Sequence, residues 1–213
     1  MAYSAVPTVA TGDLWTASNH NTYIRDNFAA GVPDIFTTKG DIAVASGPDA
    51  ASRIGVGANN NVLMADSAQT NGIKWAPISM PAGKCWRSSN QTIANNTYTV
   101  ITFTNEEFDT GNFINLGTYN SRITIPENGY FLIIGHIEFA LYNGTKYIRL
   151  KKNGSSNLME RTLVYPESLL AAQVTTLYQL AASDYIELET YQGSGSNMDV
   201  VEASLSIVRI AKI

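Results

Sequence analysis

Cysteine, histidine and charge are scarce in this chain of 213 residues, and each shortage excludes a class of protein. The one cysteine, Cys85, has no second cysteine with which to form an intrachain disulfide or a CxxC metal or redox motif. Charged residues make up 15% of the chain, against about 25% in an average soluble domain, and the net charge is −4. Because phosphate binding needs clustered Lys and Arg, this composition argues against a nucleic-acid partner.

Long apolar runs are missing as well. The longest, at residues 130–135, is the size of a strand. A membrane helix needs about 18 consecutive apolar residues or more, so we expect no membrane span. The N-terminus lacks the basic segment followed by an apolar one that marks a secretory signal. We therefore expect a soluble protein that is made in a cytosol.

Residues 1–36 are expected to form an N-terminal arm with one short helix. Thr16 has the character of an N-cap, the helix would cover residues 17–28, and Gly31 stands beyond its end. Such a helix is too short to be stable alone in water, so it must dock on another surface. That surface is either its own domain or a partner, and in the second case the arm is an anchor. The large apolar residues that would anchor it are Trp15, Tyr23, Ile24 and Phe28.

Residues 37–81 are expected to form a neck of short strands. Four apolar segments, at 42–44, 53–56, 61–64 and 73–75, are separated by Gly, Asn, Pro and Asp. Strands this short are too sparse to form a core of their own. The segment is therefore either a flexible linker or an element that neighbouring chains complete. Its regularly spaced apolar residues, which end in Trp75, favour the second alternative.

Residues 82–213 alternate apolar and polar side chains in segment after segment, which is typical of β-strands. The expected strands are 98–103, 122–125, 130–142, 147–152, 158–165, 173–180, 185–191 and 199–212. Asn153-Gly154, between two of them, is a strong hairpin signal. Because no helical segment separates these strands, the sequence predicts a mainly β protein whose C-terminal domain is an antiparallel sandwich or barrel.

Five motifs of this domain resemble the C1q/TNF family of jelly rolls. In order they are FTNEEFD at 103–109, IPENGYF at 125–131, KNG at 152–154, LAASDYIEL at 180–188 and LSIVR at 205–209. The family usually has glycine before the aspartate of the fourth motif, where this chain has Ser183, so the form of that turn stays open. The resemblance implies ten strands in two sheets and a tight homotrimer. Residues on one face of the long strand would then lie at the trimer interface: Leu132, Ile134, His136 and Glu138.

Residues 13–79 resemble N-terminal segments of bacteriophage tail-fibre and other virion proteins. The resemblance rests on LWTASNHNTYIRDN at 14–27, FTTKGDIAV at 36–44, NVLMAD at 61–66 and GIKW at 72–75. It implies a structural protein of the virion, either a capsid decoration protein or head fibre, or a short tail fibre. The lack of a long shaft favours decoration. The implied partners are further copies of the chain, capsid or tail proteins of the particle, and a host cell-surface glycan.

No residue pattern indicates an enzyme or a cofactor. The two histidines are not accompanied by a GxSxG nucleophile motif. Glu106 and Asp109 could bind calcium if they lie in a loop. The favoured interpretation of this acid-rich segment is a solvated turn flanked by Phe103 and Phe108 in the core.

Tyrosine and asparagine residues in loops could bind a sugar, because aromatic rings stack on pyranose rings and amides hydrogen-bond to hydroxyl groups. The residues concerned are Tyr142, Tyr191 and Asn197. A carbohydrate-binding lectin is therefore an alternative function. A polysaccharide depolymerase ranks lowest, because the sequence shows no convincing pair of catalytic acids.

Overall fold

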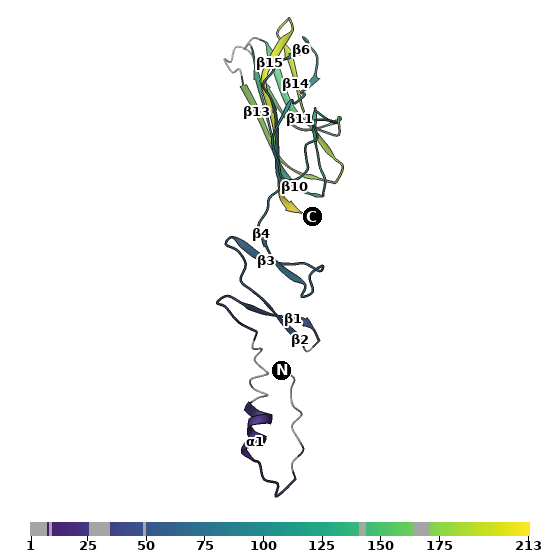
Figure 1. Cartoon of the computed structure of the whole chain (residues 1–213). Helices are drawn as coiled ribbons and strands as arrows, with labels where there is room; N and C mark the ends of the chain where they lie inside the picture. The colour runs from purple at the N-terminus through teal and green to yellow at the C-terminus, as the bar shows by residue number, and fades with distance from the viewer. Residues whose placement is uncertain (1–7, 9, 26–34, 49, 141–143, 164–170) are drawn as a thin grey trace. The chain divides into compact units, whose positions relative to one another are not determined.

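The computed structural model describes residues 8, 10–25, 35–48, 50–140, 144–163 and 171–213 (Figure 1). These residues belong to two compact units, Met1–Ser79 and Met80–Ile213. Strands dominate both units. No described helix is long and apolar enough to cross a membrane. The finer division of the first unit into an arm and a neck stays a prediction.

The helix α1 (Ala17–His20) begins where the sequence indicated. Thr16 is extended, and its hydroxyl accepts a hydrogen bond of 3.1 Å from the backbone N–H of Asn19. This bond satisfies one of the free N–H groups at the helix start, so Thr16 is confirmed as the N-cap. A π-helical turn, η1 (Asn21–Arg25), follows, and neither part has a buried side chain. The rest of the expected helix, including Phe28, lies outside the described residues.

Two antiparallel hairpins follow in the first unit. Their strands are β1 (Ile42–Gly47) with β2 (Ala50–Ile54), and β3 (Asn61–Ala65) with β4 (Ile73–Pro77). The expected strand at 53–56 was placed too late, because the Gly55 carbonyl accepts a hydrogen bond from the Trp75 indole instead of continuing the ladder. None of the residues described between 8 and 79 is buried.

The second unit is a sandwich of two antiparallel sheets. The first sheet has the order β13-β10-β15-β5-β8, with β6 beside β15, and the second has the order β12-β11-β14-β7, with β9 beside β14. The strands are β5 (Ala82–Arg87), β6 (Gln91–Ile93), β7 (Thr99–Val100), β8 (Asn105–Asp109), β9 (Arg122–Thr124), β10 (Gly129–Phe139), β11 (Thr145–Lys152), β12 (Ser156–Leu163), β13 (Ala171–Leu180), β14 (Tyr185–Gly193) and β15 (Met198–Lys212). The predicted mainly β fold with a C-terminal antiparallel sandwich is confirmed.

The hydrophobic core of this unit lies between the two sheets. Along β10, buried residues such as Phe131 and Ile133 alternate with half-exposed ones, because successive strand residues point to opposite faces. Gly135 takes an inward position where Leu188 of β14 fills the space of a side chain. Cys85 of β5 is fully buried here, and burial raises the pKa of its thiol to about 12. The core of the second unit therefore forms within one chain.

The acid-rich segment that was expected to be a turn is instead the edge strand β8. A bulge opposite Lys84 and Cys85 sets its register and pairs Phe108 with Lys84 on the outward face. Phe108 is consequently 43% exposed, so its expected place in the core was wrong. Phe103 is buried, as the sequence predicted.

Two tight turns of the second unit contain residues with positive φ angles. Asn153 and Gly154 have φ angles of 52° and 69°, which confirms the predicted hairpin turn. Ser183 has a φ of 74°, so a serine takes the left-handed conformation that glycine adopts most readily. Its N–H donates to the carbonyl of Ile125 at 2.7 Å. The turn that the sequence left open is thus made with local backbone strain at Ser183.

Candidate functional site

The residues predicted at a trimer interface share the outward face of β10. Leu132, Ile134, His136 and Glu138 are half-exposed and alternate with buried neighbours. Leu132 lies between Leu177 of β13 and Val208 of β15, whereas Glu138 lies between Ala171 and Glu202. We call this surface the outer face of the first sheet. It is apolar at the Leu132 end and polar at the Glu138 end.

A cavity of about 630 Å³ adjoins the apolar end of this face. Its lining includes Tyr130 and Leu177, which belong to the outer face, and Tyr178 and Ile213. Leu177 is 58% exposed, and Tyr130 and Tyr178 are each 41% exposed. Large apolar side chains gathered on a surface in this way are typical of a region that another protein covers.

The outward side of the second sheet carries three neighbouring tyrosines, Tyr98, Tyr147 and Tyr191, which we call the tyrosine cluster. Their ring centroids lie 5.0 Å (Tyr98 to Tyr191), 5.3 Å (Tyr147 to Tyr191) and 6.3 Å (Tyr98 to Tyr147) apart. The Tyr191 hydroxyl donates to Asn96 at 2.9 Å. The Arg149 guanidinium stands 3.7 Å from the Tyr98 ring centre. Tyr191, a predicted ligand contact, therefore joins two tyrosines that the sequence analysis did not single out.

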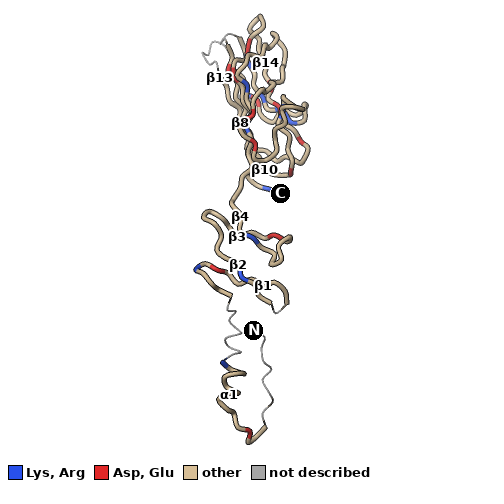
Figure 2. The backbone as a smooth tube through the Cα atoms, viewed as in Figure 1, with Lys and Arg blue, Asp and Glu red and all other residues tan. Residues whose placement is uncertain are grey.

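Charges beside the tyrosine cluster are paired within the chain. Arg149 Nε donates to Glu189 Oε2 at 2.5 Å, and Lys151 Nζ lies 3.4 Å from Glu189 Oε1. Glu189 is only 6% exposed, so its carboxylate depends on these two cations. Figure 2 shows acidic and basic positions mixed along the strands of this unit. The arrangement offers aromatic and polar contacts rather than a basic patch.

Of the other two predicted ligand residues, the structure describes Asn197. Tyr142 lies outside the described residues. Asn197 is exposed just before β15, and no hydrogen bond or ring contact among the described residues joins it to Tyr191. The preceding turn is held by Gln192, whose amide donates to the carbonyls of Ile93 and Ser196 at 3.1 and 2.8 Å.

The acids at 106–109 serve the local fold. Glu107 forms an ion pair with Lys84 at 2.6 Å. Asp109 accepts hydrogen bonds of 2.8 to 3.1 Å from three backbone N–H groups of the next loop, those of Gly111, Phe113 and Ile114. Across the described ranges, no group of three His, Cys, Asp or Glu side chains could hold a metal ion. Asp109 thus fixes the chain after β8, a role that the sequence analysis did not assign.

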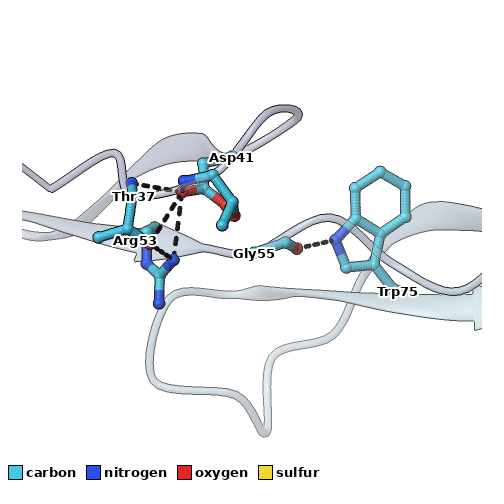
Figure 3. A network of polar contacts seen from close by, with 6 residues as sticks. Thr37, Asp41, Arg53, Gly55 and Trp75 are labelled. Carbon is cyan, nitrogen blue, oxygen red and sulfur yellow. Dashed lines mark hydrogen bonds and ion pairs between the residues drawn. The ribbon is translucent and has the colours of Figure 1, made fainter.

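A polar network in the neck surrounds Asp41 (Figure 3). Its carboxylate accepts hydrogen bonds from the backbone N–H groups of Thr37 and Thr38, at 2.7 and 2.8 Å, and Arg53 Nη1 lies 3.1 Å away. These bonds hold the pKa of Asp41 well below its usual range, and the two backbone N–H donors have the largest effect. The Thr-Thr-Lys-Gly-Asp turn was the signal in the sequence, although its role was not recognised there.

The residues predicted to anchor the arm are partly brought together. The ring centroids of Trp15 and Tyr23 lie 6.1 Å apart. Trp15 and Ile24 are each 39% exposed, so a large apolar area remains uncovered by the described chain. Phe28 lies outside the described residues.

No known family profile matches the sequence, and no curated protein matches it. Solved structures do resemble the fold. The globular domain of zebrafish complement 1qA is 15% identical with a TM-score of 0.48, and the match covers 62% of this chain and 99% of that domain. Murine APRIL at pH 5.0 is 10% identical with a TM-score of 0.48, and the match covers 62% of this chain and 100% of APRIL. The Eiger TNF protein from S. frugiperda is 10% identical with a TM-score of 0.50, and the match covers 63% of this chain and 94% of the Eiger chain. The second unit therefore has a C1q/TNF-like jelly-roll fold.

Proposed function

We propose that this chain is a trimeric structural protein of a phage particle: a capsid decoration protein or head fibre, or else a short tail fibre. Its N-terminal arm attaches to the particle, and its jelly-roll head is exposed. The observation that carries the trimer is the outer face of the first sheet, where half-exposed Leu132 and Val208 lie beside exposed Leu177. Burying one such side chain contributes about 1.5–3 kcal/mol, and a ring of three subunits repeats the contact three times.

The head also offers an edge that could fit this face. β12 and β13 end their respective sheets and lie next to each other. They expose Met159, at 44%, and Tyr178, at 41%. If the edge of one subunit packs on the outer face of the next, the contact is head-to-tail, and a three-fold rotation closes it into a ring. This arrangement would bury the apolar face and the apolar edge together.

Light scattering of the full chain tests the trimer. We expect a mass three times 23.1 kDa at micromolar concentration. Ile134→Glu puts a charge at the centre of the outer face and should yield a folded monomer. Thr118→Glu, at an exposed position between β8 and β9, outside the outer face and the β12–β13 edge, is the matched control and should stay trimeric. A monomeric wild-type chain would refute the proposal.

Attachment by the arm is supported by the exposed apolar area of Trp15 and Ile24. The double variant Trp15→Ala/Ile24→Ala should remain trimeric but should no longer bind particles that lack the protein. Ser18→Ala, an exposed position on α1, is the control and should bind normally. If the double variant binds like the wild type, the anchor lies elsewhere; if it fails to trimerise, the helix belongs to the fold. Immunogold labelling of particles separates a capsid position from a tail position.

Binding of a host cell-surface glycan is a second role, and the tyrosine cluster is the observation that favours it. Tyr98 is 40% exposed and stacks with Arg149, so it offers both a ring and polar groups to a sugar. On a glycan array, we expect the wild type to bind and Tyr98→Ala to lose binding. Tyr119→Ala removes a tyrosine of similar exposure, 45%, outside the cluster and should bind normally. A wild-type chain that binds no glycan would refute this second role.

A further inference from the structure

The neck hairpins carry apolar side chains that the described chain does not cover. Three successive residues of β3 are exposed: Val62 at 36%, Leu63 at 40% and Met64 at 45%. The hairpin is nevertheless regular, with five residue pairs in the β3–β4 ladder. Short strands of this kind are stable only if a further surface completes them.

One face of the β3–β4 hairpin is partly covered by the chain itself. Leu63 pairs with Trp75 across the ladder. The Trp75 indole donates to the carbonyl of Gly55 at 2.8 Å (Figure 3). Its ring also lies against Gly57, where an added Cβ would stand 2.6 Å from the ring. Residues 55–57 therefore cover Trp75, whereas Leu63 on the same side of the hairpin stays 40% exposed.

The opposite face is uncovered, and we call it the Val62–Met64 face. Val62 pairs with Ala76, whose small side chain permits close approach, and Met64 pairs with Lys74. The charge of Lys74 is matched by Asp66 at 2.8 Å. Because successive strand residues alternate between faces, this surface is distinct from the one that Trp75 occupies.

Charge does not oppose contact between identical copies of the neck. The Lys74–Asp66 pair and the Arg53–Asp41 pair, at 3.1 Å, are neutral within one chain. Of the charged residues described in the neck, this leaves Lys39. Figure 2 shows few charged positions, drawn in blue and red, along both hairpins. Like-charge repulsion, which usually keeps identical surfaces apart, is therefore small here.

The connection to the head limits which partner is available. β4 ends at Pro77 and β5 begins at Ala82, so only residues 78–81 join the hairpin to the head. Fully extended, they span about 14 Å. In a trimeric head, three such tethers hold the necks at an effective concentration on the order of millimolar. Other copies of this chain are thus present at a higher local concentration than a separate partner.

We propose that the Val62–Met64 faces of three copies pack together, so that the core of the neck forms between chains. This inference rests on the proposed trimer. Each chain would supply one face that is partly covered around Trp75 and one face that its neighbours cover. The neck would then be ordered in the trimer without a core of its own.

Cysteine cross-linking in the full chain tests this inference. Cys85 is buried and its thiol pKa is raised to about 12, so it should not react with a short bis-maleimide. We expect Val62→Cys and Met64→Cys to give cross-linked species on denaturing gels. Leu63→Cys, one residue away on the other face, is the matched control and should give none.

Light scattering of the same samples separates the outcomes. A trimer without cross-links at 62 and 64, or with equal cross-linking at 63, overturns the inference and leaves the proposed function intact. A monomer refutes the proposed function itself. Cross-links that form only with a protein of the particle, and not between copies, also overturn the inference, because the face would then belong to a different partner.

Discussion

Packing around Gly135 is the most direct test of the core of the head. A Cβ at this position would lie 2.6 Å from Leu188 Cδ1, 3.2 Å from Leu150 Cδ2 and 3.3 Å from Val174 Cγ2. All three neighbours are buried and come from three different strands in both sheets. Since none can move toward solvent, we expect Gly135→Ala to destabilise the head.

The size of this effect follows from two opposing contributions. Overpacking a filled core costs about 1–3 kcal/mol. Replacing a glycine within a strand stabilises by roughly 0.5–1 kcal/mol, because glycine loses more backbone freedom on folding. The free energy of unfolding should therefore fall by about 1–2 kcal/mol. For a domain of this size, Tm should fall by roughly 3–8 °C.

Thermal unfolding by circular dichroism, at one fixed protein concentration, measures this change. Gly117→Ala is the matched control, because the nearest atom to its added Cβ is 3.7 Å away, and it should not lower Tm. Leu188→Val removes the clashing methyl, so in the double variant the loss should be smaller than the sum of the two single losses. A Gly135→Ala chain as stable as the wild type, or strictly additive losses, would refute the reasoning.

Three further changes test single features. Ser183→Gly should raise the free energy of unfolding by about 1 kcal/mol, because glycine takes a φ of 74° without a Cβ penalty, whereas Ser183→Ala should give no gain in thermal unfolding. Glu189→Gln should lower the free energy of unfolding by about 3 kcal/mol, since Arg149 and Lys151 lose a buried carboxylate. An unchanged urea midpoint would contradict this. The pKa of Asp41 is lowered in the folded state. Its contribution to the free energy of unfolding is therefore complete above the ordinary aspartate pKa and is lost as the pH falls below that ordinary value. An NMR titration of the Asp41 carboxyl carbon with an ordinary midpoint would disprove the network.

The sandwich could be predicted where a strand carries its own pattern. β10, β14 and β15 are long and alternate clearly, so their side chains alone indicate which face is buried. β5 was missed because its inward positions are Gly83, Cys85 and Arg87, which do not form an apolar alternation. β8 was missed because its pairing depends on a bulge against β5, and no local pattern encodes that register.

The tyrosine cluster could be predicted only in part, for the same reason. Tyr191 was found as an aromatic residue near a loop. Its contacts with Tyr147 and Tyr98 depend on how β14 pairs with β11 and with β7, strands that lie far apart in the sequence. The buried position of Glu189 follows from the same pairing. Local residue types identify such groups one by one, but the sheet register decides which of them meet.

One sequence feature connects the two surfaces for which we propose contacts between chains. A strand with one buried face alternates, whereas a strand with apolar residues on both faces needs two partners. In β10, Leu132 and Ile134 adjoin inward Ile133, and only the inward side is filled by the chain itself. In β3, Val62 and Met64 flank Leu63 in the same way, and the chain covers only the side of Trp75, and that only in part. These non-alternating apolar residues mark the two places where we propose that a further copy of the chain supplies the missing layer.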